Sequence, residues 1–285
     1  RSASSQLVGL SAHSDRQLLK TARRYLINSK LAVHAIPGFA TIERDLKPAV
    51  DIGVEIFRVA THCTEANLAE KHVAFLRAAK VEVHGVLMMS HMATIDELIQ
   101  QARLMQSFGC TAVILMDSAG NLVPNQVISR INELQSQLEK GISFGFHAHN
   151  NLGLAVANAT SALSAGASII DAATMGLGAG AGNAQLESVM AAIKRIFEIN
   201  FQMQKFYEMS RLVERALVDF LPKTTSVSIQ SGLSGAFSGY APQVQKYASE
   251  YVVAAEKIWQ EIGKRKLVAG QESMIKEIAE DLRNI

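Results

Sequence analysis

The feature that most constrains this sequence is a regular alternation of short apolar runs with longer amphipathic segments over residues 31–178. The apolar runs have the length of strands and are almost continuously hydrophobic, which is typical of a parallel sheet covered on both faces. The segments between them have the length of helices, and the unit repeats every ~25–30 residues, as in (β/α) folds. Six strands are predicted, at residues 31–38, 55–63, 81–90, 111–120, 142–150 and 168–178.

The amphipathic segments carry helix start and stop signals. In residues 94–109, Thr94 is the predicted N-cap, Glu97 completes a capping box and Gly109 ends the helix. Strand–helix units that follow one another without a break favour a TIM-type (β/α) barrel over a doubly wound sheet. A closed barrel of this type has eight strands, so the first two strands are predicted to be absent from this chain.

The rest of the chain has helical patterns. Residues 201–220, 241–263 and 271–285 are predicted helices, and 221–239 is a predicted linker. We therefore expect two domains. These are a (β/α) barrel over residues 1–200, incomplete at its N-terminus, and a helical domain over 201–285.

Composition narrows the functional classes. The net charge of +2 indicates no nucleic-acid partner, and the basic runs at 20–24 and 264–266 are interpreted as solvated helix faces. No apolar run reaches the ~18 residues of a membrane span, and the N-terminus lacks a signal-peptide hydrophobic region. Cys63 and Cys110 are too few for a disulfide framework and fit a reducing compartment. The sequence therefore predicts a cytoplasmic globular protein with no membrane segment.

Two histidines, His147 and His149, lie in the apolar run 142–150. Side chains two residues apart in a strand point the same way, about 7 Å apart along it, and barrel enzymes place their sites at such C-terminal strand ends. The pair therefore favours two ligands of one divalent metal ion, with a carboxylate nearby. The alternative is a pair of core histidines bonded to backbone groups or to Asn150 and Asn151.

Three other predicted strands end in polar residues. Each such residue is equally well explained as a helix cap, but the strand ends of a barrel converge on one rim. The residues are Thr61, His62, Glu65, Ser90, His91, Asp117 and Ser118. After the last strand, the glycine-rich turn 175–183 leads into a helix, and its amides are candidates to bind a carboxylate or a phosphate.

Lysine is missing from all six predicted strands. The chain therefore offers no obvious residue for the imine chemistry of a lysine-dependent aldolase. If this protein makes or breaks a carbon–carbon bond, a metal ion must polarise the keto acid so that an enolate can form.

Several long motifs, in matching order, resemble those of the 4-hydroxy-2-oxovalerate aldolases, and the resemblance extends from about Gly9 to the C-terminus. It implies a TIM barrel with a C-terminal helical domain and metal-dependent cleavage of 4-hydroxy-2-oxovalerate to pyruvate and an aldehyde, in the meta-cleavage pathways of aromatic hydrocarbon catabolism. It also implies Mn²⁺ and a complex with an acylating acetaldehyde dehydrogenase, as a homodimer or heterotetramer. The motifs are "RVATHCTEA", "GVLMMSHM", "MDSAG", "FGFHAHNNLGLAVAN", "GLGAGAGNAQLE" and "LVAGQESMI".

The resemblance also implies metal ligands. His147 and His149 match the family's two histidine ligands. Asn183 matches an asparagine that reaches the metal in relatives from the wider superfamily of isopropylmalate synthases and HMG-CoA lyases.

Substrate-binding residues are expected on neighbouring strands. The run "LAVHAIPG" matches a strand that lines the family's substrate pocket, so His34 and Ile36 are expected wall residues. Asp117 and Ser118, at the end of another strand, are expected to bind substrate at the same rim.

Two departures from the family pattern concern catalysis. The family's Arg-Asp-Gly motif and the histidine after it, which supply a metal-binding Asp, an enolate-binding Arg and a proton-transfer His, do not occur here. The stretch that carries a catalytic tyrosine in the family is "SGLSGAFSGY" in this chain, with Leu233 and Phe237 at the tyrosine positions and Tyr240 out of register. No catalytic acid or base is therefore assigned.

Three hypotheses follow from these residues. The first is a metal-dependent pyruvate aldolase, a carbon–carbon lyase. The second is a catalytically impaired aldolase-like structural subunit, which the Phe237 substitution favours because a phenyl ring cannot do acid–base work. The third is a Claisen-type lyase or synthase of the same superfamily, which consumption of acetyl-CoA without aldehyde would distinguish.

Overall fold

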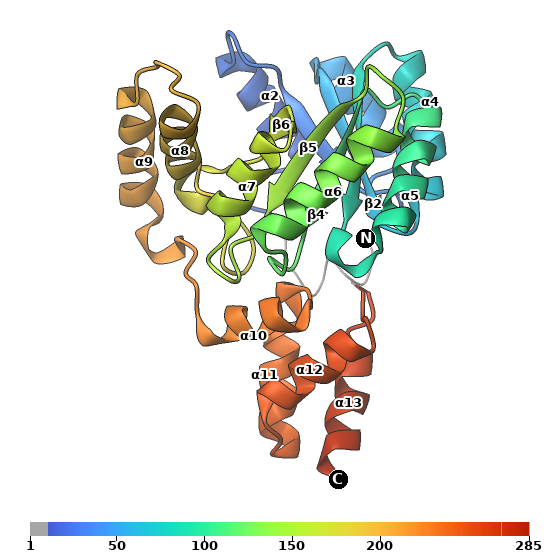
Figure 1. The fold of residues 1–285 in the computed structure, drawn as a ribbon, viewed down its shortest axis with the longest axis vertical. Helices are drawn as coiled ribbons and strands as arrows, with labels where there is room; N and C mark the ends of the chain where they lie inside the picture. Colours follow the sequence, from blue (N-terminus) through green and yellow to red (C-terminus); the bar gives the residue numbers. More distant parts are fainter. Residues whose placement is uncertain (1–10, 269, 285) are drawn as a thin grey trace. The chain divides into compact units, whose positions relative to one another are not determined.

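The computed structural model describes residues 11–268 and 270–284. Its strands form one sheet in the order β1 to β6 (Figure 1). The pairs β1–β2, β2–β3, β3–β4 and β5–β6 are parallel. All six predicted strands form, although the last, predicted over residues 168–178, is reduced to Ile169–Ile170. Their bounds are Ala32–Ala35 (β1), Ile56–His62 (β2), Glu82–Met88 (β3), Ala112–Asp117 (β4), Ser143–Ala148 (β5) and Ile169–Ile170 (β6).

The chain divides into two compact units. One comprises Arg1–Leu115 with Glu133–Phe144, and the other comprises Met116–Asn132 with Gly145–Ile285. The helices between successive strands are Lys47–Ile52 (α3), Glu70–Ala78 (α4), Ile95–Ser107 (α5), Pro124–Gln137 (α6) and Ala155–Ser164 (α7), and Asp15–Tyr25 (α2) precedes β1.

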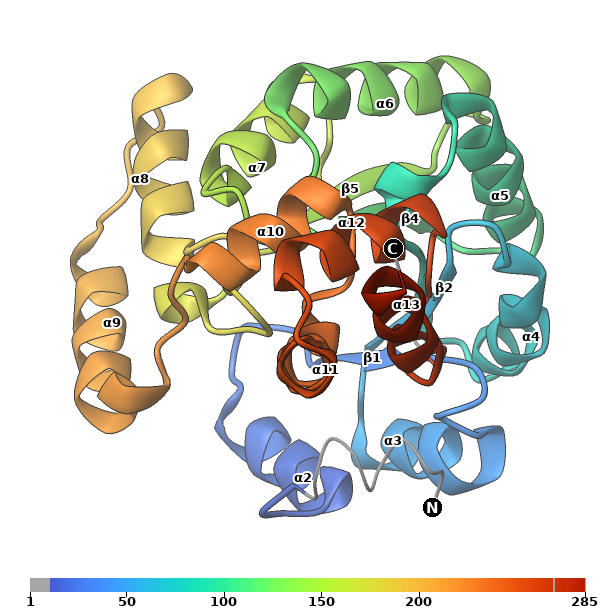
Figure 2. The same ribbon diagram turned by 90° about the horizontal axis from the view of Figure 1, so that it is seen from below.

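The first unit is organised around β1, β2 and β3. Phe57, Val59, Val83 and Val86 are completely buried, as expected for apolar strands covered on both faces. Figure 2 shows α3, α4 and α5 along the outside of these strands. An alternating strand–helix pattern thus gives the parallel α/β architecture that it predicts.

Helix α5 begins and ends where the sequence predicts. The Thr94 hydroxyl accepts the Glu97 backbone N–H, and the Glu97 carboxylate accepts the Thr94 backbone N–H, so the capping box is formed. The helix stops at Phe108, and Gly109 follows with a φ of +98°, a conformation that glycine adopts without strain.

The second unit contains residues 145–148 of β5, the whole of β6 and a short segment that pairs with both strand ends through isolated bridges. After Thr174–Gly176, a 3₁₀ turn, the chain folds back so that the Ala184 N–H donates to the Ala148 carbonyl over 3.1 Å. Residues 183 and 185 form single bridges to His149 and Ala173. Leu186–Ile196 (α8) follows directly, so a loop that is distant in sequence lies against the end of β5.

The C-terminal part of this unit is helical, as predicted. Its helices are Gln204–Leu217 (α9), Ser226–Ser234 (α10), Ala241–Tyr251 (α11), Ala255–Lys264 (α12) and Met274–Arg283 (α13). Figure 1 shows α10 to α13 gathered together. They enclose a hydrophobic core in which Trp259, Tyr240 and Ile258 are completely buried.

Two predicted features of the C-terminal part differ from the structure. The expected helix over 241–263 is two helices, because Val252 has a φ of +55° and ends α11. The expected linker over 221–239 contains α10, which begins with a capping box between Thr225 and Ser228 and ends at Gly235 in the left-handed conformation. Among the helices of the described residues, none has both the length and the apolar character needed to cross a membrane.

Candidate metal centre

His147 and His149 lie at the C-terminal end of β5, with their imidazole rings side by side. The ring centroids are 5.1 Å apart and the ring planes are inclined at 54°. The His149 backbone N–H donates to the Asp117 carbonyl over 3.3 Å, which ties the end of β5 to the end of β4. The alternation of a strand therefore brings the two rings to one face, as predicted.

Asp171 orients the first imidazole. Its Oδ2 lies 2.8 Å from His147 Nδ1, and both side chains are largely buried, at 14% and 16% exposed. The Asp171 backbone N–H donates to the Phe146 carbonyl over 3.0 Å, so the pairing of β5 with β6 fixes this carboxylate beside the ring. With Nδ1–H donating to Asp171, His147 presents the lone pair of Nε2, as metal-binding histidines do.

The second imidazole is neutral at physiological pH. The pKa of His149 is lowered to about 4, chiefly by burial and also by the neighbouring His147, while a hydrogen bond to the Ala179 backbone acts in the opposite direction. A neutral imidazole with one nitrogen held by the backbone keeps the other nitrogen available as a ligand. The surroundings of His149 therefore keep its imidazole in the neutral form that can bind a metal ion.

Asn183 brings an amide to the same place. Its backbone pairs with His149 in an isolated antiparallel bridge. Its Nδ2 donates to the Leu177 carbonyl over 2.8 Å, whereas its Oδ1 is buried with no hydrogen-bond partner. An unpartnered buried amide oxygen is costly unless something binds it. Gly178 makes room for this amide, because a Cβ at residue 178 would collide with the Asn183 side chain.

These residues fit a divalent cation in their donor atoms. Two imidazole nitrogens and one orphaned amide oxygen are a borderline-to-hard donor set that suits Mn²⁺, Fe²⁺ or Zn²⁺. Among residues 11–268 and 270–284, however, no group of three or more His, Cys, Asp or Glu side chains is arranged to hold a metal ion. The described residues thus supply part of a ligand set that still requires a carboxylate.

The glycine-rich turn 175–183 binds a carboxylate of this chain. The Met175 N–H donates to Glu187, 3.1 Å from its Oε2, and Glu187 is 7% exposed in the first turn of α8. The amides of Gly176, Gly182 and Asn183 donate to carbonyls within the turn or just before it. The turn therefore acts as a rigid frame for Asn183.

The expected substrate residues belong to different compact units of the chain. Asp117 and Ser118 are buried at the end of β4, and the Asp117 carboxylate accepts the backbone N–H groups of Asn121 and Leu122, both at 3.0 Å. His34 is exposed on β1, and Ile36, just beyond the end of that strand, is partly buried. The structure thus brings Asp117 beside His149 and leaves His34 in the other compact unit.

The remaining polar strand ends belong to the first unit. His62 Nδ1 lies 2.8 Å from the Thr64 hydroxyl, and burial lowers the pKa of His62. Ser90 is buried in the short turn Ser90–Met92, which also contains His91. The contact of His62 with Thr64 is thus local to the end of β2.

The C-terminal stretch with the altered tyrosine positions is anchored near the candidate centre. Asn151, two residues after His149, donates from Nδ2 to the hydroxyl of Ser238 over 2.7 Å, next to Phe237. Phe237 is partly buried and packs edge-to-face on Tyr240, whereas Leu233 is 70% exposed. Tyr240 itself is buried in the C-terminal core, where burial raises its pKa.

Asp171 and Glu187 were not predicted as parts of the site. Asp171 lies inside the predicted strand 168–178, and its only local signal is a carboxylate directly after the apolar pair Ile169–Ile170. Glu187 follows the glycine-rich turn in the first helical turn, a position that favours acidic residues.

Comparison with known families covers most of the chain. A family model described as HMGL-like matches residues 7–213, and one described as a DmpG-like communication domain matches residues 222–284. Among solved structures, the carboxyl transferase domain of Rhizobium etli pyruvate carboxylase has a TM-score of 0.78 at 15% identity. That match covers 94% of this chain and 50% of the other, and it supports the fold alone.

Two curated relatives are much more similar in sequence. A 4-hydroxy-2-oxovalerate aldolase of Spirochaeta aurantia is 46% identical over 283 residues, 99% of this chain and 82% of that protein. A second, from Burkholderia pseudomallei strain K96243, is 47% identical over 280 residues, 98% of this chain and 80% of that protein. The chain therefore belongs to the HMGL-like family and, within it, to the 4-hydroxy-2-oxovalerate aldolases.

Proposed function

We propose that this chain is a class II pyruvate aldolase that cleaves 4-hydroxy-2-oxovalerate to pyruvate and an aldehyde. The observation that carries the proposal is the pair His147–His149 with the orphaned Oδ1 of Asn183 at one strand end. The high identity to relatives named 4-hydroxy-2-oxovalerate aldolase supports this reaction over a Claisen-type lyase or a structural subunit.

The metal ion in this proposal is divalent, with Mn²⁺ as the expected ion. His147 and His149 would hold it through one nitrogen each, and Asn183 through Oδ1, with Asp171 fixing the tautomer of His147. When bound, the ion supplies a Lewis acid that polarises the 2-oxo group of the substrate. The chain's own residues orient His147 through Asp171 and keep His149 neutral through burial.

Cleavage breaks the bond between C3 and C4 of the substrate. The proton of the 4-hydroxyl leaves, C4 becomes the carbonyl carbon of the aldehyde, and the electron pair of the broken bond passes to the C2–C3 enolate. A proton added at C3 completes pyruvate. We place Asp117 and Ser118 at the substrate because they end the strand next to β5, and His34 and Ile36 as wall residues by resemblance. We assign neither the removal of the 4-hydroxyl proton nor the protonation of C3 to any of these four residues.

The C-terminal helices are the proposed docking region for a second enzyme. Residues 222–284 match the DmpG-like communication domain, which supports an acylating acetaldehyde dehydrogenase as the partner that receives the aldehyde. The proposal includes a boundary between the barrel domain and the helical domain at residues 200 and 201. It also includes assembly as a homodimer or a heterotetramer. We also propose that the enzyme is cytoplasmic and acts in aromatic hydrocarbon catabolism.

The proposal is tested by measuring Mn²⁺ content and pyruvate release from 4-hydroxy-2-oxovalerate in the same preparations. His147→Ala should lose stoichiometric Mn²⁺ and turnover, because it removes a ligand. His13→Ala is the matched control, since His13 is exposed on the segment before α2. Unchanged metal in His147→Ala would disprove the ligand assignment. A wild-type chain that binds Mn²⁺ but releases no pyruvate would leave the structural-subunit hypothesis.

A further inference from the structure

Helix α2 carries four cationic side chains on one face. Arg16, Lys20, Arg23 and Arg24 occupy positions i, i+4, i+7 and i+8 of Asp15–Tyr25, which lie on the same side of an α-helix. Like charges four residues apart destabilise a helix slightly, and Arg16 stands in the first turn, where the helix dipole disfavours a cation. The helix dipole therefore accounts for Arg23 and Arg24, which stand in the last turn, but not for Arg16 and Lys20.

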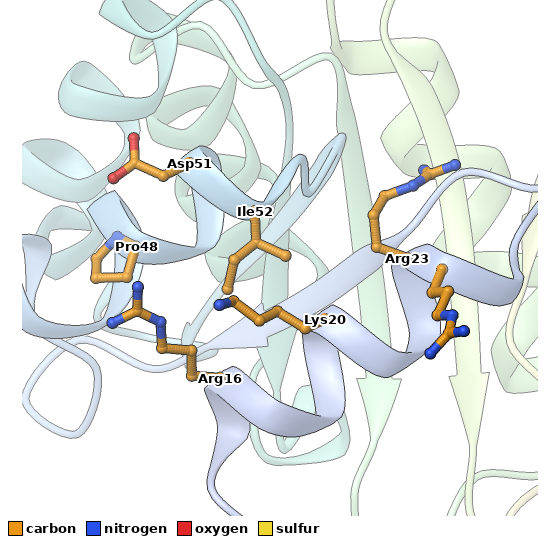
Figure 3. A pocket seen from close by; sticks show the side chains of 7 residues that line it. Arg16, Lys20, Arg23, Pro48, Asp51 and Ile52 are labelled. Carbon is orange, nitrogen blue, oxygen red and sulfur yellow. The ribbon is translucent and has the colours of Figure 1, made fainter.

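The basic stripe lines a pocket of about 580 Å³ between α2 and α3. The other side is formed by Pro48, Asp51 and Ile52. Figure 3 shows the charged ends of Arg16 and Lys20 extending toward Pro48 and Ile52, while the Asp51 carboxylate points away from Lys20. The volume lies within the range of small-molecule sites. The solvated helix face expected from the sequence is thus one wall of a concave surface.

Most of the positive charge in this pocket is not neutralised by the residues that the structure describes. Arg23 pairs with Glu55 over 2.8 Å and also donates to the Leu26 carbonyl over 3.0 Å. Within the described part of the chain, Arg16, Lys20 and Arg24 take part in no ion pair. Asp51 is the only carboxylate among the lining residues. Two or more negative charges are therefore needed to balance the pocket.

We propose that this pocket binds a small organic diphosphate, of the class of a nucleoside diphosphate. An arginine fork and a lysine ammonium are the side chains that bind phosphate oxygens, the first in a bidentate manner and the second as a point charge. The spacing of Arg16 and Lys20, four residues apart, places their charges on neighbouring helical turns, where two linked phosphates can contact both. Pro48 and Ile52 offer an apolar wall for the organic part.

The test is titration calorimetry of the full chain with ADP and with inorganic pyrophosphate, in metal-free buffer. ADP is expected to bind one per chain with a dissociation constant of about 1 mM or tighter, and the double variant Arg16→Gln/Lys20→Gln should weaken it by about tenfold or more. Raising NaCl from about 50 to about 200 mM should weaken wild-type binding, since the contacts are charged and exposed.

A charge-matched control separates the pocket from the general charge of the protein. Lys205→Gln/Lys257→Gln also removes two exposed cations, on α9 and α12, and should bind ADP like the wild type. Ile52→Ala should weaken ADP and leave pyrophosphate unchanged. Absence of saturable ADP binding, equal weakening in both double variants, or pyrophosphate binding as tightly as ADP would each overturn the proposal. None of these outcomes depends on the aldolase reaction.

Discussion

Asp171 Oδ2 lies 2.8 Å from Nδ1 of His147, and the two residues are 24 positions apart in the sequence. The contact exists because β5 and β6 pair in parallel, with Gly145 opposite Ile169. A carboxylate behind a histidine ligand fixes its tautomer and raises its basicity, and removal of such a partner commonly weakens metal binding by about 10- to 100-fold.

Asp171→Asn is therefore predicted to weaken Mn²⁺ binding by about tenfold or more while the fold is kept. The amide can still accept the hydrogen bond from Nδ1–H, but it carries no negative charge. Titration of metal-free protein with Mn²⁺ measures the change. Asp51→Asn, on the exposed side of α3, is the control and should bind Mn²⁺ normally. Equal affinities in the wild type and Asp171→Asn would remove Asp171 from the site.

The second prediction concerns the space that Gly178 leaves for Asn183. A Cβ at residue 178 would lie 2.7 Å from Asn183 Cγ and still closer to its Nδ2, so Gly178→Ala must displace this amide. We expect weaker Mn²⁺ binding in Gly178→Ala with only a small loss of thermal stability.

Gly141→Ala provides the opposite pattern as a control. Gly141 has a φ of +100° and no heavy atom within 4 Å of an added Cβ, so alanine there is strained without touching the site. It should lower the melting temperature and leave Mn²⁺ affinity unchanged. If Gly178→Ala binds Mn²⁺ as the wild type does, Asn183 is not a ligand.

The third prediction concerns the buried amide that joins the end of β5 to the C-terminal helices. Asn151 is completely buried, and its Nδ2 lies within hydrogen-bond distance of the Ser228 carbonyl and the hydroxyls of Ser231 and Ser238. Asn151→Ala removes the donor and leaves buried acceptors unsatisfied, which should lower the free energy of unfolding by about 1–3 kcal/mol. Urea denaturation measures this loss.

An exposed asparagine gives the reference value for Asn151→Ala. Asn125 lies in the first turn of α6 and is exposed. Asn125→Ala should change the free energy of unfolding by no more than about 0.5 kcal/mol. A loss in Asn151→Ala no larger than in Asn125→Ala would show that this amide does not anchor the C-terminal helices.

The fourth prediction is a loss of stability at alkaline pH. Burial raises the pKa of the Cys110 thiol to about 12, whereas an unfolded cysteine has a pKa of about 8.5. Above that value the unfolded chain loses a proton that the folded chain keeps, so the free energy of unfolding falls as pH rises, by up to about 1.4 kcal/mol per pH unit.

Cys110→Ala tests this linkage through the slope rather than the absolute stability. Between about pH 8.5 and about pH 10, inside the interval between the two pKa values above, the variant should lose less stability per pH unit than the wild type. Urea unfolding at several pH values provides the slopes. Parallel slopes would mean that the Cys110 thiol does not contribute.

The fold was predictable where the signals are local. Six apolar runs gave six strands, and the capping box at Thr94 and Glu97 formed as expected. The end of α11 was not predictable, because Val252 adopts a left-handed conformation that a β-branched residue rarely takes. The sequence over residues 241–263 therefore does not indicate that the helix ends at Val252.

The candidate site was predictable only where its residues are placed together by local structure. His147 and His149 share one strand, so the period of a strand places them together. The contact of Asp171 with His147 depends on the register between β5 and β6, and the approach of Asn183 depends on a loop that folds back on the sheet. The spacing of residues in the sequence predicts neither the register between β5 and β6 nor the path of this loop. Asn183 was predicted as a ligand only because the sequence resembles the aldolase family.

The last prediction concerns Phe237, which stands where the family pattern has a tyrosine. A phenyl ring cannot donate or accept a proton. Phe237 is partly buried, and the neighbouring Ser238 accepts a hydrogen bond from Asn151, two residues from His149. We predict that Phe237→Tyr raises the kcat of pyruvate release by at least about tenfold, within the range of general acid–base catalysis.

Leu233→Tyr is the matched comparison, because Leu233 occupies the other tyrosine position of the family pattern but is 70% exposed. A phenol there remains in solvent and should leave kcat unchanged. The pH profile of Phe237→Tyr should gain a limb that is absent from the wild type, since a new titrating group takes part. If both variants turn over at the wild-type rate with the wild-type pH profile, the phenol at residue 237 has no part in proton transfer.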